Sequence, residues 1–346
     1  MTIRENVLLA PYTTFHIGGP ARFFAEVKTD KDLTLAVTFA HDHNLPIFVL
    51  GGGSNLLVAD EGFSGLVIYM KNEIVEWKEE GGEMLAVADA GVSWDRLVAM
   101  CVERELWGLE NLSGIPGSVG ASVVQNIGAY GAEVGSRIAW VDIYEKDSQT
   151  FKRLSREDCK LAYRESIFKH PEGSQYIVLR VAYMLSRTGV PDINYKDITE
   201  YAAKEKPVRT LHDVRSAVLT IRSRKFPNYP EHPNIGTAGS FFKNPVVSGE
   251  EARVFIARYP EAPAYPQKDG NLKLSAAWII DHVLHMKGVR EGEVGTWSAQ
   301  ALVMINYGDA SAHDVAAFAS GIIKRAYNET NIQLEPEVVY VGEIKV

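Results

Sequence analysis

Hydrophobic and polar positions near the N-terminus follow one another in a pattern that predicts strand, helix and strand in succession. The run 23–27 has the length and composition of a strand. Thr29 with Asp32 three residues later matches a capping box, and the apolar positions of 33–40 then recur with helical spacing. The apolar run 47–50 is short and partly β-branched, which favours a buried strand that leads directly into glycines.

The same patterns predict elements in the rest of the chain. We expect strands at 66–70, 85–88, 138–144, 176–183 and 301–306. We expect helices at 93–105, 250–259, 275–285 and 312–328, with further helical periodicity over 197–224. The charged run 77–84 predicts a hairpin or a domain boundary, and the tail 334–341 is strand-like. The Pro-rich segment 226–236 indicates a linker or an approach to an active site.

Composition predicts a folded protein of two or three domains. The chain has 346 residues, of which 46% are hydrophobic and 23% charged. Asp plus Glu outnumber Lys plus Arg by 44 to 36, and the resulting net charge of −8 argues against nucleic acid as a partner. Cys101 and Cys159 form neither a disulfide framework nor a metal-binding motif. Without a secretory leader or an apolar run long enough to cross a bilayer, we expect a cytoplasmic protein that binds no membrane and no metal.

Two glycine-rich segments are the first candidates for ligand binding. Glycines let a loop bring consecutive backbone N–H groups close to a phosphate, so the run Gly51-Gly52-Gly53-Ser54-Asn55-Leu56 has the chemistry of a pyrophosphate cradle. It matches neither the common dinucleotide motif nor the P-loop motif, and a tight turn is the more frequent use of such glycines. The second run, 108–131, mixes glycines with small hydroxyl and amide residues over an unusually long stretch whose one charged residue is Glu110. Together the two runs favour a large cofactor.

The order of the motifs resembles one known family along nearly the whole chain. The two glycine motifs are Gly51 to Asn55 and Gly114-Ile115-Pro116-Gly117-Ser118-Val119-Gly120-Ala121. The others are Thr14-Phe15-His16-Ile17-Gly18-Gly19-Pro20-Ala21, Tyr163-Arg164-Glu165-Ser166-Ile167-Phe168-Lys169, Ala238-Gly239-Ser240-Phe241-Phe242-Lys243-Asn244-Pro245 and Leu334-Glu335-Pro336-Glu337-Val338. This ordered set resembles the UDP-N-acetylenolpyruvoylglucosamine reductase family.

The resemblance implies an α+β fold with a two-part FAD-binding unit of the vanillyl-alcohol-oxidase/PCMH type and a C-terminal α+β substrate-binding domain. On this basis we expect FAD-binding subdomain 1 at 1–72, FAD-binding subdomain 2 at 73–224 and the substrate-binding domain at 225–328. The sequence leaves open which of these parts the tail 329–346 joins.

The resemblance also implies an activity. Members use NADPH and non-covalently bound FAD to reduce UDP-N-acetylglucosamine enolpyruvate to UDP-N-acetylmuramate, a step in peptidoglycan precursor synthesis. It implies a hydride that passes from flavin N5 to C3 of the enolpyruvyl group and a proton that is delivered to C2. The cofactor-binding residues implied are Gly51, Gly52, Gly53, Ser54, Asn55, Leu56, Ser113, Gly114, Ile115, Pro116, Gly117, Ser118, Gly120 and Ala121.

Three residues match the family's catalytic positions. Arg164 would bind the substrate carboxylate with its planar guanidinium, Ser240 would donate the proton to C2, and Glu337 would assist at the reacting group. Without the resemblance, Arg164 would be taken for a surface charge and Ser240 for part of a turn. The implied substrate-binding residues are Tyr195, Lys225, Asn244 and Gln300.

Two other classes of function remain open at this point. One is an FAD-dependent oxidase of a sugar or alcohol on the same flavin fold, and the other is a non-catalytic protein that binds a nucleotide sugar. No sustained heptad requires a dimer, so we expect a monomer.

Overall fold

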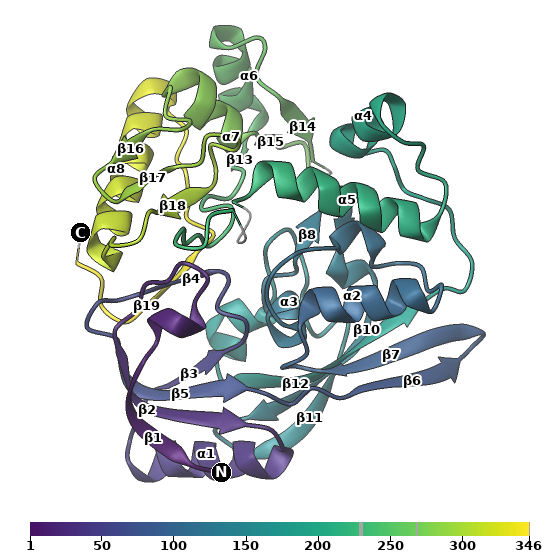
Figure 1. Cartoon of the computed structure of the whole chain (residues 1–346), viewed down its shortest axis with the longest axis vertical. Helices are drawn as coiled ribbons and strands as arrows, with labels where there is room; N and C mark the ends of the chain where they lie inside the picture. The colour runs from purple at the N-terminus through teal and green to yellow at the C-terminus, as the bar shows by residue number, and fades with distance from the viewer. Residues whose placement is uncertain (228–230, 268, 346) are drawn as a thin grey trace. The chain divides into compact units, whose positions relative to one another are not determined.

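The computed structural model describes residues 1–227, 231–267 and 269–345, and its chain divides into two compact units (Figure 1). The first unit consists of Met1–Val7, Ala21–Gly52 and Ser64–Ser223. The second unit consists of Leu8–Pro20, Gly53–Phe63 and Arg224–Val346. The chain passes between the units at several points, and one of these points falls inside the first glycine loop, between Gly52 and Gly53.

One sheet of the first unit contains the elements predicted near the N-terminus. Its strand order is β1-β2-β5-β3, with the bounds β1 Ile3–Leu8, β2 Pro20–Val27, β5 Phe63–Met70 and β3 Ile47–Leu50. Helix α1 (Asp30–Asp42) begins at the predicted capping box, where the Thr29 and Asp32 side chains each bond the other residue's backbone N–H. The predicted strands at 23–27, 47–50 and 66–70 are confirmed.

The other sheet of the first unit is antiparallel, with the order β11-β10-β12-β7-β6. Its bounds are β6 Val75–Glu80, β7 Glu83–Asp89, β10 Ile138–Glu145, β11 Thr150–Ser155 and β12 Tyr176–Leu185. The β6–β7 pair is the hairpin expected around 77–84. The unit also contains the short strands β8 Gly128–Ala129 and β9 Ala132–Glu133 and the helices α2 Trp94–Glu103, α3 Val119–Val124 and α4 Lys196–Lys204. Helix α5 (Leu211–Lys225) belongs to it as far as Ser223.

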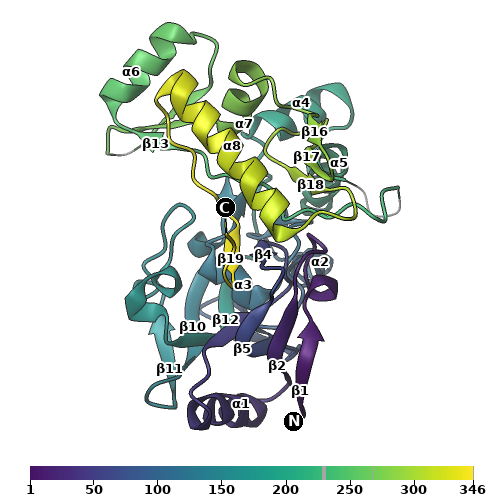
Figure 2. The same ribbon diagram turned by 90° about the vertical axis from the view of Figure 1, so that its left-hand side faces the viewer.

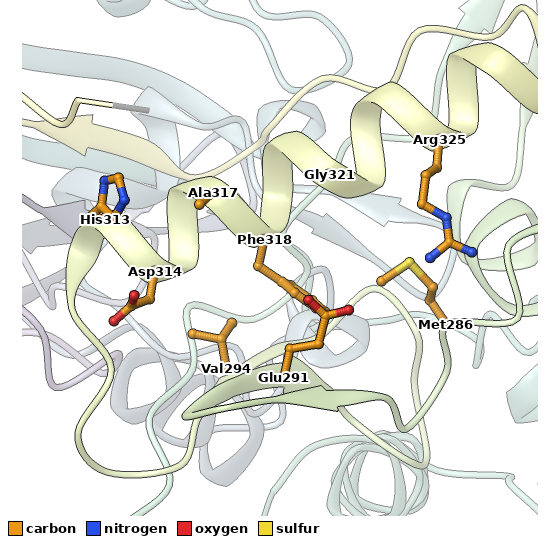
Figure 3. Close-up of a pocket in the computed structure, with 9 residues that line it drawn as sticks. All are labelled: Met286, Glu291, Val294, His313, Asp314, Ala317, Phe318, Gly321 and Arg325. Carbon is orange, nitrogen blue, oxygen red and sulfur yellow. The ribbon is translucent and has the colours of Figure 1, made fainter.

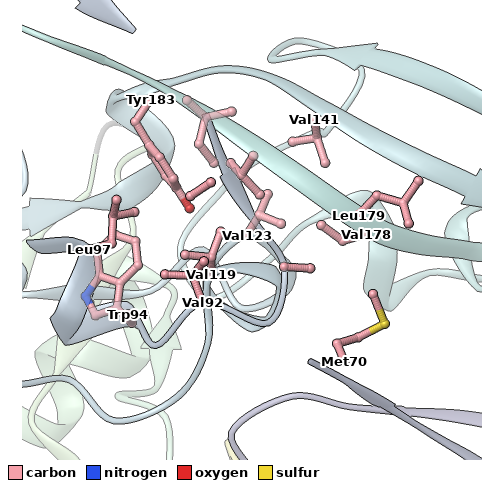
Figure 4. Packing of buried hydrophobic residues seen from close by; sticks show 14 of the residues in the cluster. Met70, Val92, Trp94, Leu97, Val119, Val123, Val141, Val178, Leu179 and Tyr183 are labelled. Carbon is pink, nitrogen blue, oxygen red and sulfur yellow. The ribbon is translucent and has the colours of Figure 1, made fainter. Parts of the chain in front are cut away.

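The core of the first unit is centred on the apolar face of α2, which packs with α3 and β12 (Figure 4). Trp94 lies edge-on to Tyr183, with ring centroids 5.8 Å apart. The hydroxyl groups of Tyr183 and Ser122 are hydrogen-bonded, with their oxygens 2.9 Å apart. Cys101 and Cys159 are buried here, and burial raises the pKa of each thiol to about 12.

The second unit is a mixture of short sheets and helices, among which α8 is prominent in Figure 2. Its sheets have the orders β13-β15-β14, β16-β17-β18 and β19-β4. The strand bounds are β4 Leu56–Val58, β13 Val246–Val247, β14 Ala264–Pro266, β15 Leu272–Leu274, β16 Arg290–Glu291, β17 Val294–Thr296, β18 Met304–Asn306 and β19 Val339–Val341. The helices are α6 Gly249–Arg258, α7 Ala276–Trp278 and α8 Ala312–Thr330.

Three predicted elements of the second unit differ from the structure. The strand expected at 301–306 is reduced to β18, because the residues before it form a turn closed by a hydrogen bond from Val303 N to Gln300 O. The helix expected at 275–285 is a short α7 followed by π-helix over Ile279–Val283, whose wider turn is not encoded in apolar periodicity. The strand expected at 334–341 is reduced to β19, because Pro336 has no N–H for a ladder and makes only an isolated bridge with Phe242. Part of the predicted Pro-rich linker, residues 228–230, lies outside the described residues.

Within residues 1–227, 231–267 and 269–345, the helices lack the length and apolar character needed to cross a bilayer.

Candidate active site

The first glycine loop follows β3 and lies directly against the second glycine loop. A Cβ added to Gly52 would come within 2.6 Å of Gly117 Cα, and one added to Gly51 would collide with Ser118 Oγ. Because real Cβ atoms do not approach backbone atoms this closely, position 52 requires glycine, whereas a side chain at position 51 would force the Ser118 hydroxyl to move. The two loops that the sequence singled out are therefore brought together, backbone against backbone.

The second loop is in turn fixed to the turn that follows β7. Gly117 O accepts a 3.1 Å hydrogen bond from Trp94 N, and Gly120 N donates to Ala90 O at 2.9 Å. A Cβ on Gly120 would lie 2.8 Å from the Cβ of Ala90. The close packing of Gly120 against Ala90 is therefore enough to explain why position 120 is a glycine.

The residues of the loop pair are suited to a dinucleotide. Ser118 Oγ is buried, and no group among the described residues hydrogen-bonds to it. A buried hydroxyl without a protein partner, beside glycines that leave the main chain accessible, fits a phosphate or ribose oxygen. The predicted Ala121 lies 3.5 Å from a Cβ placed on Gly51, and Ile115 packs on the core of the first unit. This part of the chain accordingly fits FAD.

Charged side chains bond both backbone polar groups of Gly114, its N–H and its C=O. Asp95 Oδ1 accepts from Gly114 N at 2.6 Å, and Arg222 Nε donates to Gly114 O at 3.0 Å. Arg215 holds Asp95 by two bonds of 2.6 and 2.9 Å. Burial raises the pKa of Asp95, but the hydrogen bonds from Arg215 and Gly114 outweigh it and leave this pKa below its usual value. Nearby, Ser113 is buried and donates its hydroxyl proton to Glu110 O at 2.6 Å.

Tyr195 lies at the start of α4 and contacts another tyrosine. Its ring packs edge-on against that of Tyr130, with centroids 5.5 Å apart, and its side chain is partly exposed. Tyr130 is buried and hydrogen-bonded to Arg222. Burial raises the pKa of Tyr130 to about 12, so its hydroxyl is neutral at physiological pH.

Arg164 lies between β11 and β12 on a strained stretch of backbone. Its φ is +54°, in the left-handed region that disfavours branched or bulky residues. Its guanidinium donates to Gly128 O at 3.1 Å, and its own carbonyl accepts from Lys169 Nζ at 2.6 Å. Arg164 is therefore a held, half-buried side chain and not the mobile surface charge that its sequence neighbourhood indicates.

In the second unit, the end of the first glycine motif holds the segment that contains Glu337. Asn55 Nδ2 donates to Glu337 O at 3.0 Å, and Val339 N donates to Asn55 O at 2.9 Å. Leu56 opens β4, which pairs in parallel with β19. Ser54 lies in the turn between Gly53 and Asn55.

Ser240 lies on the neighbouring segment. It pairs with Val303, and the next residue, Phe241, accepts a 2.8 Å hydrogen bond from Glu337 N. Ser240 and Glu337 thus occupy adjacent segments of the second unit. By contrast, Glu335 is exposed and forms an ion pair with Lys243, with Nζ and Oε2 3.7 Å apart.

The remaining predicted substrate residues are also in the second unit. Asn244 Oδ1 accepts from Ala276 N at 3.0 Å, which fixes the start of α7. Gln300 belongs to the turn before Val303, where Val303 N donates to Gln300 O at 3.0 Å. Lys225 is the last residue of α5. Pro116, predicted as a cofactor contact, lies between Ile115 and Gly117 in the first unit.

A cavity of about 450 Å³ opens on the face of α8 (Figure 3). It is lined by Met286, Glu291, Val294, His313, Asp314, Ala317, Phe318, Gly321 and Arg325. None of these described lining residues is a predicted site residue, so the cavity is separate from the candidate site.

Comparison with known proteins identifies the family. Residues 21–152 match the FAD binding domain family, and residues 230–341 match the C-terminal domain of UDP-N-acetylenolpyruvoylglucosamine reductase. A UDP-N-acetylenolpyruvoylglucosamine reductase of Neisseria meningitidis serogroup A is 41% identical over 97% of this chain and 96% of that protein. The chain belongs to the UDP-N-acetylenolpyruvoylglucosamine reductase family.

Other members of this reductase family agree in length and in fold. The Porphyromonas gingivalis W83 protein of the same name is 37% identical over 99% of this chain and 100% of its own length. The crystal structure of the reductase from Thermus caldophilus matches 99% of this chain with a TM-score of 0.68 and 27% identity. The predicted family, the α+β fold with an FAD-binding unit, and FAD as cofactor are confirmed.

Four residues of the reductase to which sequence reasoning assigned no role support the predicted motifs. Asp95 and Arg222 hold Gly114, Arg215 holds Asp95, and Thr14 N donates to Gly53 O at 3.1 Å. Arg215 and Arg222 are seven residues apart on α5, a spacing that places them on one helix face and could have shown that they act together.

Replacing Gly52 with alanine should weaken FAD binding. A methyl group forced against Gly117 costs about 1–3 kcal/mol, equivalent to about 5- to 150-fold in affinity. The measurement is the FAD dissociation constant, from fluorescence quenching of the apoprotein. Gly321→Ala is the control, because its added Cβ meets no described atom within 4 Å. Equal FAD affinity in both variants would contradict the close contact of the two loops.

Asp95→Asn should lower stability in a pH-dependent way. Because the folded-state pKa of Asp95 is depressed, its stabilisation is present above the unfolded-state pKa and is lost as pH falls through the folded-state pKa. Since the side chain is partly exposed, we expect a difference on the order of 1 kcal/mol at pH 7 that shrinks below about pH 4. Urea unfolding at several pH values measures it, with exposed Asp147→Asn as control. A difference that stays constant down to pH 3 would refute the ionic role.

Proposed function

We propose that this chain reduces UDP-N-acetylglucosamine enolpyruvate to UDP-N-acetylmuramate with NADPH as the reductant. The supporting observation is that one residue of the first glycine motif, Asn55, bonds the backbone of Glu337, while the Glu337 amide bonds Phe241 beside Ser240. A motif suited to the cofactor and two candidate catalytic residues are therefore joined by hydrogen bonds to the main chain of residue 337 and its neighbours. Membership of the reductase family gives the reaction.

When bound, FAD supplies the hydride chemistry, and the protein supplies binding, charge stabilisation and a proton. The two glycine loops, with Ser118, would hold the dinucleotide. We assign the remaining predicted cofactor contacts, from Gly51 to Leu56 and from Ser113 to Ala121, to the same task.

The protein's own chemistry is divided among three side chains. Ser240 would deliver its hydroxyl proton to C2 of the enolpyruvyl group, and Glu337 would polarise that group. Arg164 would bind the substrate carboxylate and stabilise the negative charge that develops on it. Its hydrogen bond to Gly128 O fixes one end of the guanidinium and so limits the entropy lost on binding.

The proposal includes Tyr195, Lys225, Asn244 and Gln300 as substrate-binding residues. It also retains the division into 1–72, 73–224 and 225–328, and a monomeric, cytoplasmic enzyme without a nucleic-acid partner. The net charge of −8 supports the last point, because a nucleic-acid surface requires clustered cations.

The purified protein should be yellow, and its flavin should bleach on anaerobic addition of NADPH. Adding the enolpyruvyl nucleotide sugar should then restore the oxidised spectrum. A flavin that NADPH does not reduce but a sugar or alcohol does would indicate the oxidase. A colourless protein that FAD cannot reconstitute would indicate a binding protein.

Ser240→Ala should separate the two half-reactions. Flavin reduction by NADPH needs no proton from Ser240 and should be unchanged, whereas reoxidation by the enolpyruvyl substrate should slow by about 100- to 10,000-fold. Stopped-flow absorbance of the flavin measures both steps, and Ser174→Ala, an exposed serine of the first unit, is the control. Equal losses in the two steps would refute the proton-donor assignment.

A further inference from the structure

We infer that Thr14 is a positioning residue that holds Ser240 in register with the first glycine loop. The inference rests on the proposed role of Ser240, but it concerns a residue to which neither the motif analysis nor the proposed mechanism assigns a function. It is carried by a continuous chain of hydrogen bonds within the second unit.

Thr14 uses three polar groups to join two distant segments. Its N–H donates to Gly53 O at 3.1 Å. Its Oγ1 donates to Thr237 O at 2.7 Å, and its own carbonyl accepts from Thr237 N at 2.9 Å. One residue thus fixes the glycine loop on one side and, 223 positions further along the chain, the segment before Ser240 on the other.

The glycine loop has little freedom at this junction. Gly53 has a φ of +62°, and a Cβ there would collide with Tyr12 O. The backbone of the loop therefore packs directly against the segment that contains Thr14. A shift of this segment must shift Gly53 with it.

The link continues from Thr237 to Ser240. Thr237 Oγ1 accepts from Gly239 N at 3.2 Å, and Gly239 turns the chain with a φ of +77°. Ser240 then forms an isolated β-bridge with Val303, and this pairing fixes its position beside the Val303 segment. The Thr14–Thr237 bonds set where this segment begins.

A second contact secures the same junction. Gly236 exchanges two 2.9 Å backbone hydrogen bonds with Asn306, and the fully buried Asn306 side chain donates to Phe15 O at 3.0 Å. Because Asn306 also holds the neighbouring segment, removing the Thr14 hydroxyl should shift the approach to Ser240 without unfolding it. A shift of about 1 Å is enough to cost on the order of 100-fold in a step that depends on orientation.

The test compares Thr14→Val, which removes the hydroxyl at nearly constant volume, with Thr14→Ser, which keeps it. Thr14→Val should slow flavin reoxidation by the enolpyruvyl substrate by about 10- to 100-fold, leave flavin reduction by NADPH within about twofold, and raise the solvent deuterium isotope effect on reoxidation. Thr14→Ser should recover most of the lost rate. Thr330→Val is the matched control, because it removes a threonine hydroxyl bonded to the Ala326 carbonyl at 2.6 Å in the same unit.

The outcomes distinguish this inference from the proposed function. If Ser240→Ala slows reoxidation but Thr14→Val does not, the positioning role of Thr14 is refuted and the proton-donor role survives. If Ser240→Ala has no effect, the proposed proton-donor role of Ser240 is refuted, and the inference about Thr14, which rests on it, is refuted as well. If Thr14→Val loses stability, Thr237→Val tests the same link through its bond to Gly239, and equal losses in both half-reactions for that variant would overturn the inference.

Discussion

The contact between the two glycine loops is the constraint on which the candidate cofactor site depends. Where Gly52 lies against Gly117, no side chain separates the two stretches of main chain. On the second loop, the Asp95 and Arg222 side chains bond the backbone of Gly114, and Arg215 holds Asp95 in place. Each residue has only one backbone donor and one backbone acceptor. Hydrogen bonds from charged side chains are stronger than neutral ones, so two of them are enough to fix the position of Gly114.

Local sequence predicted the elements whose signals are themselves local. The capping box at Thr29 and the short apolar run of β3 are signals contained in a few consecutive residues, and both elements are present as predicted. The π-helix at Ile279–Val283 and the shortened strand β19 were not foreseen. The π-helix has a wider turn that apolar periodicity does not encode. The shortening of β19 follows from Pro336, which lies within the predicted run and has no N–H for a ladder.

In the candidate site too, the sequence predicted the residues that lie in local motifs and did not predict the residues that act on distant parts of the chain. The family motifs located the glycine loops, Arg164, Ser240 and Glu337 because these residues lie in short recognisable strings. Asp95, Arg222 and Thr14 lie outside the residues that those motifs single out for function, since each acts on the backbone of a residue far away in sequence. A bond to a backbone N–H or C=O does not depend on which side chain the partner residue has, so the sequence around the partner does not reveal it.

The burial of both cysteines has a practical consequence. With the pKa of each thiol near 12, almost none of either is thiolate at neutral pH, and neither sulfur reaches the surface. The two native thiols are therefore expected not to react with thiol-directed labelling reagents in the folded protein. A single cysteine introduced at an exposed position such as Tyr327 could carry a fluorophore or spin label without prior removal of the natural ones.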